Sequence, residues 1–361
     1  MTILTREIAY NGLSAFFQNN KPFVLFGTGT SCAVHTDFGM GALKEHLLTE
    51  VAKLTLSPES RSQWNGVVRA LAKDNDLESA MNAVNDEELT CQIVRLTGEF
   101  VSSLDKQHGL RIARGEVLWP TISIIENLVK GLPETDRKLH VATPNYDLLA
   151  EYAFERAKIR YVTGYVGGVC KEINWKQADH SMTYHEKGVK GKFTLKSMKH
   201  IRFYKVHGSL NTFKLNNTSV ENNSWMYGVP MGVERLMITP GTAKHQKLHE
   251  SRNDLLSEFD QGVASHNAFL FLGFGFNDSQ LSNSKIRQKL VDQQCPGVII
   301  TRDSNPRIDE ILSLSQNLWL VCRQPDNHGT RIFNKRYSDG LLLDNEKLWV
   351  FDQFATKILG G

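Results

Sequence analysis

Short, largely apolar runs recur along the chain, most of them apolar at consecutive positions, and each run leads into glycine or polar turn residues. These runs are rich in β-branched and aromatic side chains, and they span residues 22–26, 139–143, 201–206, 235–239, 269–272 and 297–301. Strands buried on both faces of a sheet have this continuous apolar pattern, whereas half-exposed strands alternate. Segments with helical periodicity separate most of the runs. The order therefore predicts an α/β fold with a Rossmann-like, doubly wound parallel sheet.

Two stretches depart from this alternation. From 58 to 132, apolar residues recur mostly at three- and four-residue steps, which is typical of amphipathic helices. We therefore expect an inserted helical subdomain over 58–132, and a principal domain made of 1–57 and 133–304. Residues 161–200 are richer in glycine, lysine and threonine, and they predict a small irregular or β insertion.

The tail, residues 305–361, predicts a small C-terminal β extension. It contains a helical segment, an apolar run at 318–322 that is typical of a strand, and a pattern over 331–351 that indicates a hairpin. We see no internal repeat in the chain and no low-complexity segment.

Composition narrows the class of protein. The 361 residues carry 42 Lys and Arg against 39 Asp and Glu, so the net charge of +3 does not favour direct nucleic-acid binding. No basic stretch followed by an apolar one opens the sequence, and no apolar run is long enough to cross a bilayer. The five cysteines are widely spaced, which favours reduced, buried thiols over disulfides or a zinc ribbon. We expect a cytoplasmic protein without a metal.

The first candidate motif is the glycine-rich turn Gly27-Thr28-Gly29-Thr30-Ser31, which follows the first apolar run. Such a turn between a strand and a helix brings backbone N–H groups close to a pyrophosphate. The usual dinucleotide-binding spacing requires a third glycine at position 32, where this chain has Cys32. By itself the motif is equally compatible with a tight turn that binds nothing.

Three further motifs follow apolar runs. In Thr143-Pro-Asn-Tyr-Asp147, Asn145 is suited to bind ribose hydroxyls or a water, or to form a turn, and Asp147 is suited to cap the next helix. His207 precedes a glycine and is either a general base or a structural histidine. In 272–278, glycines allow close backbone approach, and the final aspartate is suited to cap a helix.

The order of the four motifs, each at the end of a predicted strand, resembles the sirtuin-like NAD-binding family over about residues 20–300. The resemblance implies a domain that binds NAD and cleaves its nicotinamide–ribose bond. It assigns the phosphates to Gly27, Thr28, Gly29, Thr30 and Ser31, the nicotinamide-ribose pocket to Asn145 and Asp147, the catalytic base to His207, and the adenosine half to Gly273, Gly275, Asn277 and Asp278.

The sequence departs from the protein deacylase branch of that family in two respects. Deacylases carry a zinc ribbon of two CxxC pairs after the catalytic histidine, and here only Cys295 and Cys322 follow His207. Deacylases also have a Pro-Asp-Phe-Arg segment after the first motif, where this chain reads His35-Thr-Asp-Phe-Gly39. The pattern is more similar to the bacterial anti-phage branch, whose members hydrolyse NAD and deplete it in the infected cell.

The resemblance also implies partners. A compact chain of this kind resembles the sirtuin-like subunit that pairs with a HerA-type hexameric ATPase, and we expect a homo-oligomer. NAD glycohydrolase activity is the favoured prediction, with Asn145 and His207 as the catalytic residues. The alternatives are an ADP-ribosyltransferase or deacylase, and a non-catalytic nucleotide-sensing scaffold subunit.

Overall fold

A nine-stranded sheet forms the centre of the molecule. The computed structural model describes residues 2–73, 76–82, 84–187, 191–239, 256–278, 281, 285–326 and 329–360. From one edge to the other the strands are β16 (Leu341–Leu343), β15 (Thr330–Asn334), β14 (Leu318–Arg323), β13 (Gly297–Ile300), β12 (Phe269–Leu272), β1 (Phe23–Phe26), β2 (Lys138–Thr143), β8 (His200–Lys205) and β3 (Arg160–Val162). All neighbours from β14 to β3 are parallel. The predicted α/β, doubly wound class is confirmed.

Strand β1 shows why the apolar runs are continuous. Val24 and Phe26 belong to a core on one face of the sheet, and Phe23 and Leu25 belong to a core on the other. Helices α1 (Arg6–Asn19), α7 (Ile122–Lys130), α8 (Leu149–Arg156) and α15 (Phe351–Phe354) contribute to the first core, and α11 (Ser257–Ser265), α13 (Lys285–Arg287) and α14 (Pro306–Leu314) contribute to the second. Because both faces are covered, every position of the strand is buried.

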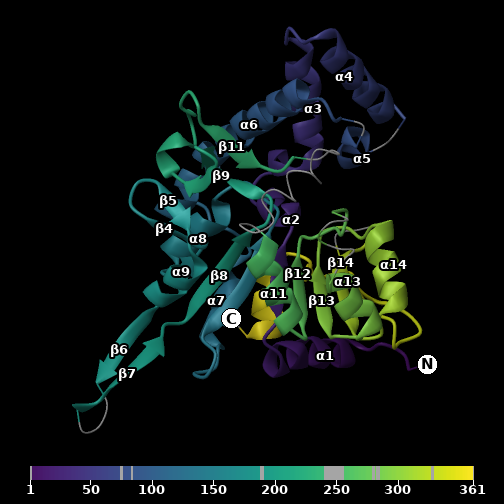
Figure 1. Cartoon of the computed structure of the whole chain (residues 1–361). Coiled ribbons are helices and arrows are strands. Elements are labelled where there is room, and N and C mark those ends of the chain that lie inside the picture. Colours follow the sequence, from purple (N-terminus) through teal and green to yellow (C-terminus); the bar gives the residue numbers. More distant parts are fainter. Residues whose placement is uncertain are drawn as a thin grey trace.

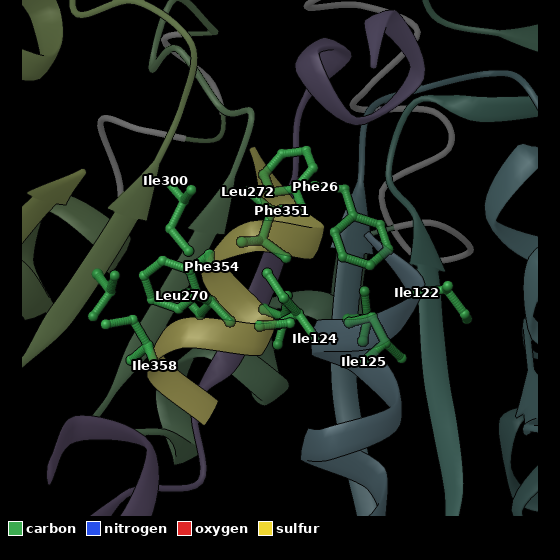
Figure 2. Close-up of a cluster of buried hydrophobic side chains, with 14 of the residues drawn as sticks. Phe26, Ile122, Ile124, Ile125, Leu270, Leu272, Ile300, Phe351, Phe354 and Ile358 are labelled. Atoms are coloured by element: carbon green, nitrogen blue, oxygen red, sulfur yellow. The ribbon is translucent and has the colours of Figure 1, made fainter. Parts of the chain in front are cut away.

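The end of the chain completes the first core. Phe351 and Phe354 of α15 and Ile358 beyond it lie against Leu270 of β12 and Ile124 of α7 (Figure 2). The tail was expected to form a small C-terminal β extension, and its first strand, β14, pairs in parallel with β13 and so continues the main sheet. The expected hairpin is β15 with β16, which add two antiparallel strands at the same edge.

A second, antiparallel sheet lies beside the main one. Its order is β11 (Glu234–Met237), β9 (Gly208–Leu215), β10 (Thr218–Glu221), β5 (Lys171–Ile173) and β4 (Tyr165–Gly167). The run at 235–239 was expected in the parallel sheet, and this prediction is wrong because β11 pairs antiparallel with β9. Only Met237 of β11 is buried, so this strand lacks the two-sided burial of the central strands.

The segment at 161–200 also contains α9 (Trp175–Ser181) and a two-stranded hairpin, which extends away from the body of the molecule (Figure 1). The hairpin consists of β6 (Thr183–Lys187) and β7 (Phe193–Ser197). The expected β insertion in this part of the chain is therefore present, with one helix within it.

The helical region is organised differently from the expected 58–132 unit. A separate core joins α3 (Met40–Ala52), α4 (Pro58–Leu71), α5 (Leu77–Met81) and the first half of α6 (Glu87–Arg114). These helices form one end of the molecule (Figure 1). In contrast, Ile112 of α6 and Ile122, Ile124 and Ile125 of α7 belong to the core of the main sheet. The helical unit thus begins earlier, at α3, and ends within α6.

The five cysteines are free thiols, although the expectation that they are buried holds only for some of them. Cys295 and Cys322 are buried, whereas Cys91 and Cys170 are exposed. Within the described ranges, no helix combines the length and apolar character that crossing a bilayer requires.

Candidate active site at the switch point of the sheet

The strand order reverses direction at β1. The chain passes from β1 to β2 on one side, while β12 lies on the other side and leads outward to β13 and β14. In open α/β sheets, ligands bind at the carboxyl ends of the strands beside such a reversal. A cavity of about 410 Å³ lies there, within the size range of small-molecule sites.

The cavity collects most of the predicted site residues. Those that line it are Gly27, Thr28, Ser31, Asn145, Asp147, His207, Gly273, Gly275, Asn277 and Asp278. Gly29 and Thr30 are not among the lining residues. The opposite wall was not anticipated: it includes Met40 and Leu43 of α3, Leu77 and Glu78 of α5, and Phe100 of α6. No motif signals this wall, because it depends on how the helical unit packs.

The two glycine-rich turns contact each other through their backbones. Gly29 N–H donates to Gly273 O at 3.0 Å, and Gly27 N–H donates to Leu272 O at 2.9 Å. A Cβ atom on Gly27 would lie 2.3 Å from Gly273 O, closer than atoms can approach without a shift. Glycine is required here because the neighbouring strand end passes so close.

This packing changes the interpretation of the first turn. Thr30 N–H donates to Gly27 O at 3.0 Å, so the amides of Gly27, Gly29 and Thr30 are all engaged within the protein. The expectation that these three amides hold phosphates is therefore not supported. Within the described ranges, the backbone N–H groups of Phe274, Gly275 and Asn277 have no acceptor, and all three residues line the cavity.

Asn145 is held by three hydrogen bonds. Its Nδ2 donates to Gly27 O at 3.0 Å, to Ser31 Oγ at 2.9 Å and to Thr30 Oγ1 at 3.3 Å. Because a carbonyl oxygen can only accept, the bond to Gly27 O determines which end of the amide faces the turn. Asn145 Oδ1 accepts no hydrogen bond from the described residues, so it remains available to a ligand hydroxyl or a water.

Asp147 links the first turn to α8. Ser31 Oγ donates to Asp147 Oδ2 at 2.8 Å, and Leu149 N–H donates to Asp147 Oδ1 at 3.2 Å. The anticipated contact with the start of the following helix is therefore present. The second contact, with Ser31, connects the end of β2 to the turn after β1. It holds residues 144–148, which we call the Asn145 loop, against that turn.

His207 lies at the end of β8, where the main sheet meets the second sheet. Ile238 N–H donates to His207 O at 2.9 Å, and Gly208 has a φ of +76°, where a Cβ would lie 1.8 Å from Leu236 O. The side chain of His207 is 6% exposed, and its Nε2 is 3.0 Å from Asp278 Oδ2. The sequence had not connected these two residues.

A buried charged cluster lies behind the Asn145 loop. Lys205 Nζ donates to Asp147 O at 2.6 Å and pairs with Glu151 Oε1 at 3.1 Å. Asp105 of α6 accepts from Leu148 N–H at 2.7 Å. Burial raises the pKa of Asp105 to about 7 and that of Glu151 to about 7. Sequence reasoning missed these residues, because no local pattern distinguishes them from solvated charges.

Replacing Asp105 by asparagine is expected to make the protein more stable at neutral pH. The folded-state pKa of Asp105, about 7, lies above the ordinary value of 3.8, so its contribution to stability is lost as pH rises between them. Asparagine keeps an oxygen for Leu148 N–H and does not ionise. The advantage of Asp105→Asn in the free energy of unfolding should grow by on the order of 1 kcal/mol per pH unit over that interval. Urea unfolding at pH 5 and pH 8 measures it, and an equal difference at both pH values would contradict the prediction.

Among the described residues that line the cavity, the aspartates and glutamate give it an acidic character. Asp76, Glu78, Asp147 and Asp278 line it together with His207, and no lysine or arginine of the described ranges does so. Such a lining favours a ligand group that is positive or that becomes positive during reaction. Within the same ranges, no three His, Cys, Asp or Glu side chains gather in the arrangement of a metal site.

The fold and the cavity at its switch point are those of a Rossmann-like α/β protein. A family model described as SIR2-like domain matches residues 139–309, a little under half of the chain. The match includes Asn145, Asp147, His207 and the turn at 273–278, and it excludes the turn at 27–31. It supports the sirtuin-like resemblance and fits an NAD-related activity. No match was found among curated proteins.

Proposed function

We propose that this protein is an NAD⁺ glycohydrolase, which cleaves NAD⁺ to nicotinamide and ADP-ribose. The observation that carries the proposal is the convergence of Asn145 and His207 in one cavity at the switch point of the sheet. Asn145 offers a side-chain carbonyl oxygen that has no partner among the described residues, and His207 offers an imidazole. Orientation of a ribose or a water together with proton transfer is what hydrolysis of this bond requires.

The acidic lining suits the reaction. When the glycosidic bond breaks, nicotinamide leaves with the bonding electron pair and positive charge develops on the ribose. Carboxylates such as Asp147 stabilise that charge electrostatically in a partly buried site. Asn145 Oδ1 orients a ribose hydroxyl or the attacking water. His207 accepts the proton that the water loses as its oxygen bonds to the ribose carbon, an effect worth roughly 10²- to 10⁴-fold in rate.

The diphosphate needs donors, and the described lining residues offer no cationic side chain. The unengaged amides of Phe274, Gly275 and Asn277 supply N–H groups on one turn. Consecutive backbone N–H groups in a turn make a concavity that binds anions. We therefore transfer part of the phosphate-binding role from the turn at 27–31 to the turn at 273–278.

Incubation of the purified protein with NAD⁺ tests the proposal, with nicotinamide and products separated by chromatography and mass spectrometry. Free nicotinamide and ADP-ribose in equal amounts are expected. ADP-ribosylated protein or O-acyl-ADP-ribose would instead identify a transferase or a deacylase. Binding of NAD⁺ without nicotinamide release would identify a nucleotide-sensing scaffold subunit.

We further propose that the hydrolysis depletes NAD⁺ as an effector of bacterial anti-phage defence. An enzyme that removes the NAD⁺ of its own cell must be inactive until it is triggered. Self-association, or docking with a HerA-type hexameric ATPase, is the proposed control. The same assay, run with and without the candidate ATPase and across protein concentrations, should show a rise in rate on assembly. Full activity of the dilute protein alone would contradict this control.

A further inference from the structure

Asp278 and His207 form a partly buried pair inside the cavity. Their side chains are 11% and 6% exposed, and Asp278 Oδ2 lies 3.0 Å from His207 Nε2. The two residues come from different strand ends, since His207 follows β8 and Asp278 follows β12. Within the described ranges His207 Nε2 has no well-aligned hydrogen bond, so the pair is a close electrostatic contact. Catalytic hydrogen bonds are often poorly aligned before substrate binds.

The other oxygen of Asp278 shows how the carboxylate is held. Leu281 N–H donates to Asp278 Oδ1 at 3.2 Å. This bond is the capping role expected for an aspartate at the start of a helical turn. Oδ2 is the oxygen that lies 3.0 Å from the imidazole. The carboxylate of Asp278 therefore does two things: it accepts the capping hydrogen bond within the turn after β12, and it contacts His207 at the end of β8.

We propose that Asp278 is a positioning residue for His207, holding the imidazole with its proton on Nε2 so that Nδ1 is the proton acceptor. The inference rests on the proposed NAD⁺ hydrolysis and deepens it. The O–H bond of the attacking water breaks, its oxygen bonds to the ribose carbon, and its proton passes to Nδ1. The imidazolium that forms is stabilised by the carboxylate, which remains ionised. The resemblance to the sirtuin-like family had instead associated Asp278 with the adenosine half.

Asp278→Asn separates this role from capping, since asparagine keeps an oxygen for Leu281 N–H and loses the charge. We expect kcat for nicotinamide release to fall about 10²-fold while KM for NAD⁺ is unchanged. Asp278→Glu should restore part of the activity. Asp303→Asn is the matched control, because Asp303 follows β13 at the same edge of the sheet, pairs with Arg323 and does not line the cavity.

A second measurement does not depend on hydrolysis. Nitrogen NMR of ¹⁵N-histidine-labelled protein without NAD⁺ reports which imidazole nitrogen of His207 carries the proton, with His207→Ala providing the assignment. We expect the Nε2-protonated tautomer in the wild type and a loss of that preference in Asp278→Ala. This readout tests the pair even if the wild type proves not to hydrolyse NAD⁺, which would count against the proposed function instead.

Two results would overturn the positioning role. One is a rise in KM with unchanged kcat in Asp278→Asn, which would make Asp278 a binding residue. The other is the same His207 tautomer in the wild type and in Asp278→Ala.

Discussion

His207→Ala is expected to reduce the rate of nicotinamide release by roughly 10²- to 10⁴-fold. Alanine removes the only imidazole among the described lining residues of the cavity, and the other described lining side chains offer no equivalent nitrogen base. The loss should appear in kcat more than in KM, because the ring is proposed to act on the proton of the attacking water. Initial rates over a range of NAD⁺ concentrations separate the two constants.

The control for this variant is His185→Ala, the same substitution at an exposed position of the β6–β7 hairpin. It should retain the wild-type rate. Circular dichroism and thermal unfolding establish that His207→Ala is folded, since its side chain is buried beside Asp278. Full activity in a folded His207→Ala protein would remove His207 from the mechanism.

Gly27→Ala is expected to destabilise the protein by about 3 kcal/mol. The added Cβ would lie 2.3 Å from Gly273 O and 2.5 Å from Phe274 Cα, and both are backbone atoms. Backbone cannot rotate away as a side chain can, so the ends of β1 and β12 must separate. The midpoint of urea or thermal unfolding measures this loss.

Gly66→Ala provides a contrast at a second glycine. Gly66 lies within α4, and its added Cβ meets no atom within 4 Å. Alanine there should stabilise the protein by roughly 0.5–1 kcal/mol, because glycine is unfavourable in a helix. If Gly27→Ala weakened NAD⁺ binding without any loss of stability, the turn would be primarily a ligand site and the packing argument would be wrong.

The local pattern of apolar residues was sufficient to predict where most strands of the main sheet lie along the chain. The runs that became β1, β12 and β13 are apolar at nearly every position, and those that became β2 and β8 are apolar apart from His140, Arg202 and Lys205. Each run was expected at its observed place. The run at 235–239 was misassigned to the parallel sheet. A short apolar run indicates burial, but it carries no information on which strand will pair with it or in which direction.

The candidate site was predictable to the same extent. Glycine, asparagine and histidine at strand ends identified the edge where a ligand would bind, since parallel strands bring their carboxyl ends together. The roles within the first turn were not predictable. Whether the amide of Gly29 faces a phosphate or the carbonyl of Gly273 depends on how closely the end of β12 approaches the first turn. The residues of that turn do not predict this distance.

The sequence by itself thus determined the class of fold and the edge of the sheet where the candidate site lies. Both follow from short-range apolar periodicity and from the residue types at strand ends. The two residues proposed for the chemistry were assigned through the resemblance of the ordered motifs to the sirtuin-like family. Only the tertiary structure decided the pairing of Asp278 with His207 and the wall of the cavity made by α3, α5 and α6. It also decided that backbone amides of the first turn bond to the end of β12. Such contacts join segments far apart in the chain, and they arise only when the cores of the sheet and of the helical unit pack together.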